Sequence, residues 1–501
     1  MTALIREPLF LFYAERKEEL MLDVAIIGCG ITGAAAAYEL SKYRLSLGVF
    51  ERENDVSIGT TKANSAILHA GYDAEPGTLM AACNVEGSRL AAEICRDLDV
   101  PYRQTGSMVV AFEDEQVPLL RELYGRGIQN GVSGLALLDG AEARQMEPGL
   151  SHTVLGALHA PAAAVVNPWE YALALAETAV RNGAQLYLGC GVTDIRRAGD
   201  FYTLVTPRGE FAAKAIINAA GIYADRVHEM AGDKEFTIHA NRGEYFILDK
   251  SEGNRVSRVI FQCPTREGKG VLVSPTVHGV LLVGPNAEDI PGREDLQNTA
   301  EGLRFVAAKA SLSVPCVDVG KSIRNFSGLR AVADTGDLVI AESKTAKRFI
   351  NLAGIKSPGL SAAPAIAKRA VALLKNAGIR LEPKDNFINR RKKIRINELS
   401  MQEQNALIAG NPAYGRVVCR CETVTEGEIL DALASPIPPR SLDGVKRRCG
   451  TGLGRCQGGF CGPRVLEILA RELGIPPGEI WLDRDGSFIV TGDNRKEAAN
   501  V

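Results

Sequence analysis

Residues 23–40 read "DVAIIGCGITGAAAAYEL". With Leu22, the pattern predicts a short buried strand over Leu22–Ile27, a glycine-rich turn and a helix of small residues over Ala34–Leu40. The turn has the spacing GxGxxG, formed by Gly28, Gly30 and Gly33. Glycines at these places permit a tight turn, a close approach of a pyrophosphate and tight helix packing, and the helix N-terminus favours an anion. A second strand, "LSLGVFE", ends at Glu51, where an acid can accept hydrogen bonds from ribose hydroxyls. The stretch therefore predicts a dinucleotide site on a Rossmann-like α/β fold.

Length and composition indicate a globular protein of two or three domains. The chain has 501 residues, of which 46% are hydrophobic and 24% charged, with a formal net charge of -2. Lys and Arg are not in excess, so no nucleic-acid partner is expected. No run of about eighteen apolar residues occurs, and residues 1–20 have too short an apolar run for a secretory signal. We expect a cytoplasmic protein whose contact with a membrane, through a partner, is at most peripheral.

Three further segments resemble the glycine-oxidase and D-amino-acid-oxidase superfamily. They read "TTKANSAILHAGYDAEPGTLMAACNVEG" (60–87), "AKAIINAAGIYAD" (213–225) and "NLAGIKSPGLSAAPAIAKRAV" (351–371). The resemblance extends over residues 21 to about 375 and implies that the dinucleotide is FAD. The cofactor-binding residues that the GxGxxG motif and the resemblance together imply are Gly28, Gly30, Ile31, Thr32, Gly33, Glu51, Arg52, Thr60, Thr61, Asn64, Ser65, Val192, Ala220, Gly221, Gly354, Gly359 and Leu360.

Within this superfamily, "NSAILHAGYDAEP" is similar to both flavin-dependent glycerol-3-phosphate dehydrogenases and L-2-hydroxyglutarate dehydrogenases. Stretches such as "RGEYFIL" and "VGKSIRNFSGLRAVA" predict an antiparallel sheet, which in the family covers the flavin and carries the substrate. Oxidation of an alcohol needs a base for the hydroxyl proton and cations for an acidic substrate. The resemblance suggests His69 as the base or as a proton-positioning residue, and Arg330 as the residue that binds a carboxylate or phosphate. Lys269, Ser357, Tyr245 and Lys356 are further candidates, whereas the other five histidines are expected to be structural.

Five cysteines stand close together near the C-terminus, in "VVCRCETVTEGEIL" (417–430) and "RRCGTGLGRCQGGFCGP" (447–463). Without an export signal the compartment is reducing, which favours a metal site over disulfides. The CxxC pairs typical of zinc are absent, and the flanking glycines would free N–H groups for cluster sulfurs. Zinc and a set of free thiols remain alternatives to iron–sulfur.

This region resembles the bacterioferritin-associated-ferredoxin-like (BFD-like) [2Fe–2S] domain, which also ends the large subunit of anaerobic glycerol-3-phosphate dehydrogenase. The resemblance covers residues 415 to about 475. It implies that Cys419, Cys421, Cys456 and Cys461 bind the cluster. Cys449 is expected to be a spectator, with replacement of one ligand as the alternative. Helices are expected to begin after Thr423 and at Pro463.

The domain organisation follows from these segments. We expect an N-terminal extension (1–20), an FAD-dependent oxidoreductase domain (21–385) whose substrate sheet comes mainly from 100–165 and 240–330, a linker (386–414), a small helical [2Fe–2S] domain (415–480) and a tail (481–501). The basic residues 390–393 of the linker are expected to be a solvated face, with docking to a partner or to anionic lipid as the alternative.

Together the two sites predict a dehydrogenase that takes two electrons from an alcohol and passes them on singly. A flavin can do both. The first expectation is oxidation of sn-glycerol 3-phosphate to dihydroxyacetone phosphate, with transfer to a flavoprotein, an iron–sulfur subunit or a quinone-linked partner. The alternatives are an L-2-hydroxyglutarate or other 2-hydroxy acid substrate, an opine or amine substrate, and an electron-transfer subunit without its own substrate. No second GxGxxG occurs, so no NAD(P)H site is expected.

Overall fold

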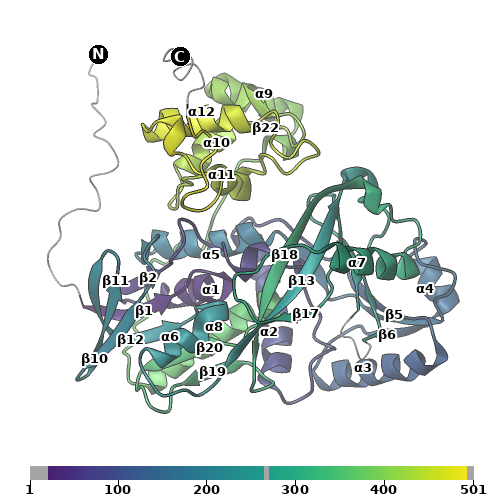
Figure 1. The fold of residues 1–501 in the computed structure, drawn as a ribbon, viewed down its shortest axis with the longest axis horizontal. Coiled ribbons are helices and arrows are strands. Elements are labelled where there is room, and N and C mark those ends of the chain that lie inside the picture. The colour runs from purple at the N-terminus through teal and green to yellow at the C-terminus, as the bar shows by residue number, and fades with distance from the viewer. Residues whose placement is uncertain (1–20, 265–269, 493–501) are drawn as a thin grey trace, which may run out of the picture. The chain divides into compact units, whose positions relative to one another are not determined.

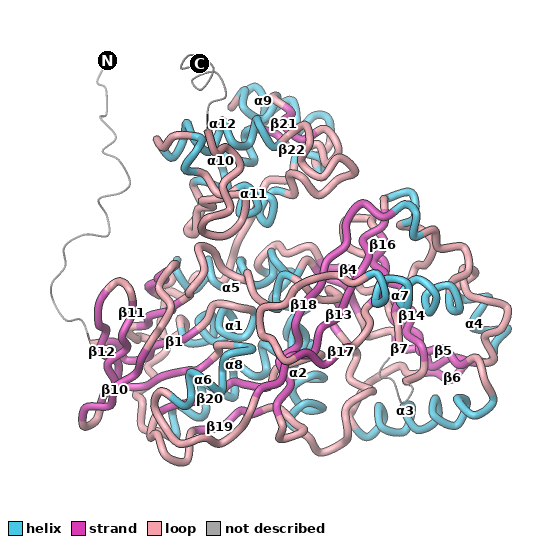
Figure 2. The backbone as a smooth tube through the Cα atoms, in the orientation of Figure 1, coloured by secondary structure: helices cyan, strands magenta, loops and turns pink. Residues whose placement is uncertain are grey.

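A computed structural model describes residues 21–264 and 270–492 (Figures 1 and 2). Contacts divide these residues into two compact units. The larger unit comprises Leu22–Arg52 and Val56–Lys392, apart from the residues that are not described. The described part of the smaller unit comprises Met21, Glu53–Asp55 and residues 393–492.

The first sheet of the larger unit has eight strands and contains the predicted dinucleotide-binding strand. Its strands are β1 (Leu22–Ile27), β2 (Leu47–Phe50), β9 (Gln185–Tyr187), β10 (Asp194–Ala198), β11 (Phe201–Thr206), β12 (Gly209–Asn218), β19 (Val339–Glu342) and β20 (Phe349–Ala353). Strands β9, β2, β1, β12 and β20 pair in parallel in that order. The first of the two predicted strands is confirmed at both ends, and its interior residues are buried because the sheet is covered on both faces.

Helices from distant parts of the chain pack together around this sheet. They are α1 (Ile31–Leu40), α2 (Leu79–Asp97), α5 (Pro168–Arg181), α6 (Ala224–Glu229) and α8 (Gly359–Asn376). Helix α1 contacts α5 and α8, and α8 also contacts α2. Gly87 of α2 permits the last contact, because a Cβ atom there would lie 2.3 Å from the Ser361 carbonyl oxygen.

The second sheet of the larger unit has nine strands. They are β5 (Ser107–Ala111), β6 (Ala136–Asp139), β7 (Gly156–Ala160), β13 (Ile238–Leu248), β14 (Val259–Gln262), β15 (Leu272–Pro275), β16 (Leu281–Gly284), β17 (Glu288–Ile290) and β18 (Ser322–Ala333). All pairs are antiparallel except β14 with β5. Figure 1 shows β13 and β18 between the strands β10–β12 at one end of this unit and β5 and β6 at the other.

Shorter elements complete the larger unit. A three-stranded sheet joins β3 (Ile67–Leu68), β8 (Ala164–Val166) and β4 (Tyr102–Arg103). Helices α3 (Val117–Gln129), α4 (Gly140–Met146) and α7 (Ala300–Ser313) flank the second sheet, and α7 contacts β13, β15 and β16. The predicted fold class, a Rossmann-like domain interleaved with a largely antiparallel sheet, is confirmed.

The smaller unit is mainly helical. Its elements are α9 (Met401–Gly410), β21 (Val417–Cys419), β22 (Val424–Thr425), α10 (Glu426–Leu433), α11 (Leu442–Cys449) and α12 (Gly462–Leu473). Apolar residues of α10, α11 and α12 form its core with Val418 and Val424. Helix α10 begins later than expected, because its N-cap is Thr425 rather than Thr423, with a capping box to Glu428. Helix α9, with a capping box between Ser400 and Glu403, lies in the segment expected to be a linker.

The sequence predicts a solvated face for the basic residues 390–393, and the structure shows that this prediction is wrong for Arg391. The side chain of Arg391 is only 8% exposed and forms ion pairs with Glu170 at 3.2 Å and Glu177 at 2.7 Å. Both acids lie on α5, and such a buried cation needs paired carboxylates to offset its desolvation. This arginine therefore anchors the end of the larger unit.

Among the helices of residues 21–264 and 270–492, none combines the length and the apolar character that a membrane-spanning helix needs.

Candidate functional site

The candidate cofactor site lies at one edge of the first sheet. Ile27 of β1 pairs with Asn218 of β12 and with Phe50 of β2, and Asn218 pairs with Asn351 of β20. Because these strands are parallel, their carboxyl ends meet at the same edge. The turns that follow them carry Gly28 and Glu51 of the predicted dinucleotide motif, Ala220 of segment 213–225 and Gly354 of segment 351–371.

The glycines of the first turn are required by close backbone contacts. Gly28 has φ +96°, and a Cβ atom there would lie 2.5 Å from the carbonyl oxygen of Ala219. At Gly33 a Cβ atom would lie 1.9 Å from the carbonyl oxygen of Gly28. The turn, helix α1 and the end of β12 are therefore in direct contact. A cofactor bound at this edge would face the backbone of the turn rather than side chains.

The N-terminus of α1 fits a pyrophosphate. Its N-cap residue, Gly30, offers no side-chain cap, and the first turn contains no acidic residue. The Glu51 carboxylate accepts a hydrogen bond from the Cys29 N–H at 2.7 Å, and Thr61 Oγ1 accepts one from the Ile31 N–H at 2.9 Å. Glu51 and Thr61 thus lie at the glycine turn, as expected of residues that bind FAD. Thr32 is buried in the first turn of the same helix.

The remaining predicted cofactor residues line the adjoining turns. The Arg52 guanidinium lies 4.4 Å from the centre of the Tyr223 ring, and Val192 packs against the core beside the end of β2. Asn64 Nδ2 donates to the Thr61 carbonyl oxygen at 2.7 Å. Gly221 and Gly354 adopt positive φ, whereas Gly359 and Leu360 begin helix α8.

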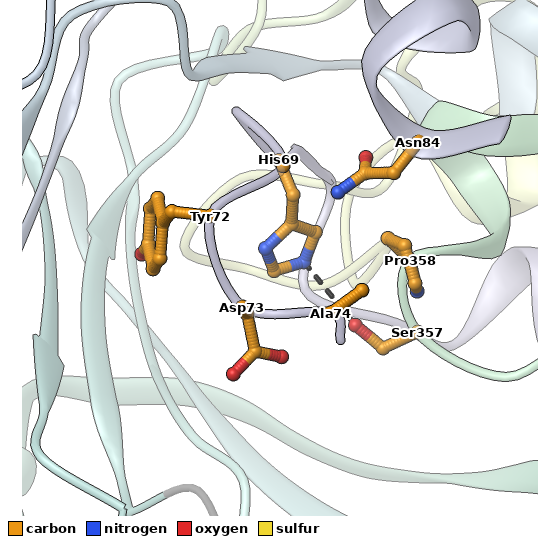
Figure 3. A pocket seen from close by; sticks show the side chains of 8 residues that line it. His69, Tyr72, Asp73, Ala74, Asn84, Ser357 and Pro358 are labelled. Atoms are coloured by element: carbon orange, nitrogen blue, oxygen red, sulfur yellow. Dashed lines mark hydrogen bonds between the residues drawn. The ribbon is translucent and has the colours of Figure 1, made fainter. Parts of the chain in front are cut away.

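A small pocket lies beside His69 (Figure 3). Its lining includes His69, Tyr72, Asn84 and Ser357. His69 Nε2 lies 3.3 Å from Ser357 Oγ, and the backbone N–H of His69 donates to Ser361 Oγ at 2.7 Å. Figure 3 shows the His69 ring and the Ser357 hydroxyl pointing toward each other. The structure therefore brings together two residues that were predicted to take part in catalysis.

Arg330 lies on β18, which pairs with β13. It stands opposite Asn241, whose Oδ1 accepts a hydrogen bond from Arg330 Nη1 at 2.5 Å, and Nη2 donates to the Asn286 carbonyl oxygen at 3.3 Å. Within the described ranges no carboxylate forms an ion pair with Arg330. Since both partners are neutral, the positive charge of the guanidinium is not compensated, which suits an anion-binding residue.

The same strands connect Arg330 to the predicted flavin loop. Thr60 Oγ1 donates to the Leu329 carbonyl oxygen at 2.7 Å. Tyr245, two positions beyond Gly243 on β13, places its hydroxyl 3.3 Å from Ser65 Oγ. Because alternate strand residues share a face, Asn241, Gly243 and Tyr245 face the same way. This face of β13 therefore looks toward the cofactor loop.

Other candidates have different outcomes. Lys269 lies outside the described residues. Lys356 is part of the turn before α8, where its N–H donates to the Gly354 carbonyl oxygen at 3.0 Å. The other histidines are His152, His159, His228, His239 and His278, of which His228 is buried and accepts or donates in hydrogen bonds with Asn351 and Asp233.

Several neighbours of the candidate site were not predicted from the sequence. Asn241 holds Arg330, Phe326 stacks on Tyr245 with ring centres 4.6 Å apart, and the Phe261 ring lies 5.7 Å from that of His69. Asn84 is buried in the pocket, and its Oδ1 has no hydrogen-bond partner within the described chain. These contacts depend on strand register and helix packing, and no local sequence signal announces them.

The predicted cluster ligands form two pairs. Cys421 Sγ lies 3.7 Å from Cys456 Sγ, and Cys461 donates a hydrogen bond to Cys419. Metal–thiolate bonds of about 2.3 Å at a tetrahedral centre would hold two sulfurs about 3.8 Å apart. Across residues 21–264 and 270–492, no group of three or more metal-binding side chains converges on one point. Two pairs of thiols fit a two-iron cluster better than a single zinc ion.

Hydrogen bonds favour the thiolate form of one cysteine in each pair, Cys419 in one and Cys456 in the other. The hydrogen bond from Cys461, with N–H groups that include that of Gly452, lowers the pKa of Cys419 to about 6. The N–H of Phe460 is the main cause that lowers the pKa of Cys456. Gly454 packs against Cys421, since a Cβ atom there would lie 2.3 Å from the Cys421 Cβ. The glycines thus bring the loop onto the sulfurs, as the sequence had suggested.

Cys449 differs from these four thiols. Its Sγ donates a hydrogen bond to the Glu428 carbonyl oxygen at 3.3 Å, and its side chain packs against the core of the smaller unit. That contact favours the expected spectator role over that of an iron ligand.

Comparisons with known proteins agree with both sites. The family of FAD dependent oxidoreductases (DAO) matches residues 23–373, and the BFD-like [2Fe-2S] binding domain matches residues 417–471. A glycerol 3-phosphate dehydrogenase of Caloramator mitchellensis is 48% identical over 478 residues, which cover 95% of this chain and 100% of that protein. Mouse mitochondrial L-2-hydroxyglutarate dehydrogenase is 33% identical over 278 residues, 52% of this chain and 60% of that protein.

A solved structure shares the fold of the larger unit. Dithionite-reduced L-alpha-glycerophosphate oxidase from Mycoplasma pneumoniae, with FAD bound, superposes with a TM-score of 0.72 at 31% identity. The match covers 99% of that chain but 75% of this one.

Proposed function

The chain belongs to the family of FAD dependent oxidoreductases, with FAD and a [2Fe–2S] cluster as its cofactors, and we propose that it oxidises sn-glycerol 3-phosphate to dihydroxyacetone phosphate. The observation that carries this proposal is the similarity to the Caloramator glycerol 3-phosphate dehydrogenase, which extends over 95% of the chain and so includes both units. The similarity to the mouse L-2-hydroxyglutarate dehydrogenase covers only 52% of the chain.

Arg330 is proposed to hold the substrate phosphate. A phosphate monoester carries about -1.5 to -2 charges at neutral pH. Arg330 uses two of its N–H groups on Asn241 and Asn286, and its charge remains uncompensated. A guanidinium has five N–H donors in a planar fork, so the others can bind phosphate oxygens.

His69 is proposed to accept the proton of the substrate hydroxyl at Nε2, which also faces Ser357 Oγ. Removal of that proton lets the carbonyl form as the hydrogen on carbon 2 departs with two electrons. FAD, when bound at the glycine turn, supplies the acceptor for this hydride. The chain's own contribution is to orient the alcohol between His69 and the cofactor loop.

The smaller unit is proposed to pass the electrons to a partner protein. The match to the Mycoplasma oxidase covers 75% of this chain, whereas the match to the Caloramator dehydrogenase covers 95% of it. An enzyme that delivered electrons directly to oxygen would not need a one-electron carrier. A protein acceptor, such as a flavoprotein, an iron–sulfur protein or a quinone-linked subunit, gives the cluster a role.

An anaerobic substrate screen tests the proposed activity. The FAD-loaded protein is mixed with sn-glycerol 3-phosphate, L-2-hydroxyglutarate, an opine or a simple amine, and flavin absorbance near 450 nm is followed. Rapid bleaching by glycerol 3-phosphate, with dihydroxyacetone phosphate as product, is the expected result. Preferential bleaching by another compound would replace the proposed substrate. Bleaching by none of them, with reduction only through a partner, would favour a carrier subunit.

Replacement of Arg330 by Ala is expected to weaken substrate binding strongly. Hydrogen bonds to charged groups contribute about 1.5–3 kcal/mol, which corresponds to a loss of about 10- to 150-fold in kcat/KM. The loss should appear mainly in KM, measured by steady-state kinetics with an artificial acceptor. Gly243→Ala provides a second variant, because its Cβ would lie 2.6 Å from Arg330 Nη2 and displace the guanidinium. Unchanged KM in both variants would remove Arg330 from the substrate site.

Replacement of His69 by Asn is expected to slow flavin reduction by about 10²-fold or more, since general bases contribute about 10²–10⁴-fold. FAD content should not change, because His69 contacts the Ser357 hydroxyl rather than the glycine turn. Stopped-flow absorbance under anaerobic conditions measures the step directly. The matched control is His152→Asn, at an exposed histidine outside the pocket. Equal rates in the two variants would show that His69 is not the base.

A further inference from the structure

The loops that hold the cluster cysteines expose a phenylalanine and several arginines. The Phe460 side chain is 82% exposed, although its neighbour Cys461 is buried. Arg420 stands between Cys419 and Cys421, Arg455 precedes Cys456, and Arg464 lies in the first turn of α12. We name the exposed residues Arg420, Arg455 and Arg464 the arginine rim. Aromatic residues and arginines are both enriched at protein–protein interfaces, so this combination beside the cluster cysteines favours a docking site.

The charge of these loops is strongly one-sided. Residues 416–422 and 452–464 contain four arginines and one acid, Glu422. One arginine is already neutralised, because Arg416 forms an ion pair with Glu426 at 2.6 Å. Arg420 and Arg464, by contrast, form no ion pair with residues that the structure describes. The uncompensated positive charge therefore lies beside the cysteines.

The thiols reach the surface at this same place. Cys421 is exposed and Cys456 partly exposed, whereas Cys419 and Cys461 are buried. The backbone N–H of Phe460 also donates a hydrogen bond to the Cys456 sulfur. A redox partner that covered Phe460 would thus come within a few residues of the more accessible pair of cluster ligands.

We propose that this edge of the smaller unit docks an acidic electron-transfer protein, with Phe460 as the apolar anchor and the arginine rim as the source of electrostatic attraction. The proposal rests on the proposed function and adds the chemistry of the partner. Oxidation of one alcohol releases two electrons and two protons. The protons go to solvent, and each docking event passes one electron from the reduced cluster to the oxidised centre of the partner, so two events complete one turnover.

The size and charge of the surface fit a transient complex. One exposed aromatic side chain and three cations suit a small interface of the kind that redox partners use. Complementary charge raises the association rate by about 10–10³-fold at low salt and loses this effect as ionic strength rises. An acidic acceptor should therefore react faster than a basic one, and its advantage should depend on salt.

The test uses the full holoprotein with two haem acceptors of opposite charge, soluble cytochrome b5 (acidic) and cytochrome c (basic). Enzyme reduced by excess sn-glycerol 3-phosphate under anaerobic conditions is mixed with each acceptor in a stopped-flow instrument. The rate with cytochrome b5 should fall at least about tenfold between low salt and about 0.5 M salt. At low salt, Arg420→Glu and Arg464→Glu should each slow it about tenfold and Phe460→Ala about fivefold.

The matched controls lie near the N-terminus of α11, whereas the glycine-rich cysteine loop follows its C-terminus. The helix is about 12 Å long. Arg440→Glu makes the same charge change at an exposed arginine before that helix, and Phe488→Ala removes an exposed aromatic ring next to its N-terminus, where Trp481 bridges Ser441 and Phe488. Both should leave the rate with cytochrome b5 unchanged. Cluster content is checked by iron analysis and visible absorbance in each variant. If Phe460→Ala loses the cluster, the rates of the two arginine variants still test the proposed docking site.

Three results would overturn the proposal. The first is an equal or faster reaction of cytochrome c at low salt, and the second is an unchanged rate in both arginine variants. The third is slower reduction of the cluster by the flavin, with the acceptor step unchanged, which would assign the edge to a contact within the chain. If glycerol 3-phosphate does not bleach the flavin, the substrate proposal fails alone, because the docking step can still be measured after reduction with dithionite and removal of the excess.

Discussion

Replacement of Gly33 by Ala is expected to yield a protein that retains less than about a tenth of its FAD and of its activity. A Cβ atom at this position would lie 1.9 Å from the Gly28 carbonyl oxygen and 3.4 Å from the Ala219 Cβ. Both neighbours belong to the turn at the carboxyl edge of the first sheet, so the new methyl group must push α1 away from the cofactor site. Overpacking costs about 1–3 kcal/mol or more, and each 1.4 kcal/mol corresponds to a tenfold loss of affinity.

The measurement is the ratio of flavin to protein after purification, followed by titration with FAD. The matched control is Gly59→Ala, in the nearby loop before Thr60, because a Cβ atom at Gly59 would meet nothing within 4 Å. That variant should bind FAD like the wild type. Cluster absorbance should be the same in both variants, since the cysteines belong to the smaller unit. Full FAD content in Gly33→Ala would contradict the assignment of this turn to the pyrophosphate.

The sequence predicted most accurately what neighbouring residues determine. The strand Leu22–Ile27 was predicted correctly, because a short apolar run that ends at a glycine is too short for most helices and is typical of a buried strand. The helix after it begins at Ile31, earlier than the small residues from Ala34 had suggested, because Gly30 already serves as its N-cap. Helix α9 has an equally local signal, the capping box from Ser400 to Glu403, although the segment around it lacks clear apolar periodicity.

The parts that could not be predicted depend on residues far apart in the chain. Arg391 is buried because α5 presents Glu170 and Glu177 to it, and those acids lie more than two hundred positions earlier. A basic run alone gives no indication of such partners, so solvent exposure was the natural expectation. Burial of charge is decided by tertiary packing, which composition does not reveal.

The candidate site shows the same division. The family resemblance suggested His69, Ser357 and Arg330, and the structure adds the contact between the first two. Asn241, which orients Arg330, was missed because the pair depends on the register between β13 and β18. A shift of one residue in that register would place Asn241 on the other face. The sequence therefore indicates the candidate residues themselves, but not the neighbours, such as Asn241, that hold them in position.

Replacement of Cys456 by Ser is expected to remove the cluster while leaving the flavin chemistry intact. Cys421 Sγ and Cys456 Sγ are 3.7 Å apart, the spacing of two thiolates on one iron, so the replacement removes one of the two thiolate ligands of that iron. Iron should fall from about two atoms to fewer than about 0.2 per chain. Anaerobic bleaching of the flavin by glycerol 3-phosphate should continue at the wild-type rate, because FAD is bound by the larger unit. Reduction of a protein acceptor should be lost.

Cys449→Ser is the control that separates a ligand from a spectator in the same helical unit. The Cys449 thiol donates to the Glu428 carbonyl oxygen, a hydrogen bond that a serine hydroxyl can also make. Iron content, visible absorbance and acceptor reduction should therefore match the wild type. If iron is lost from Cys449→Ser and retained in Cys456→Ser, Cys449 replaces Cys456 as a ligand. The glycine-rich loop would then have to hold the cluster through a set of thiols other than the two pairs seen in the structure, because Cys449 belongs to neither.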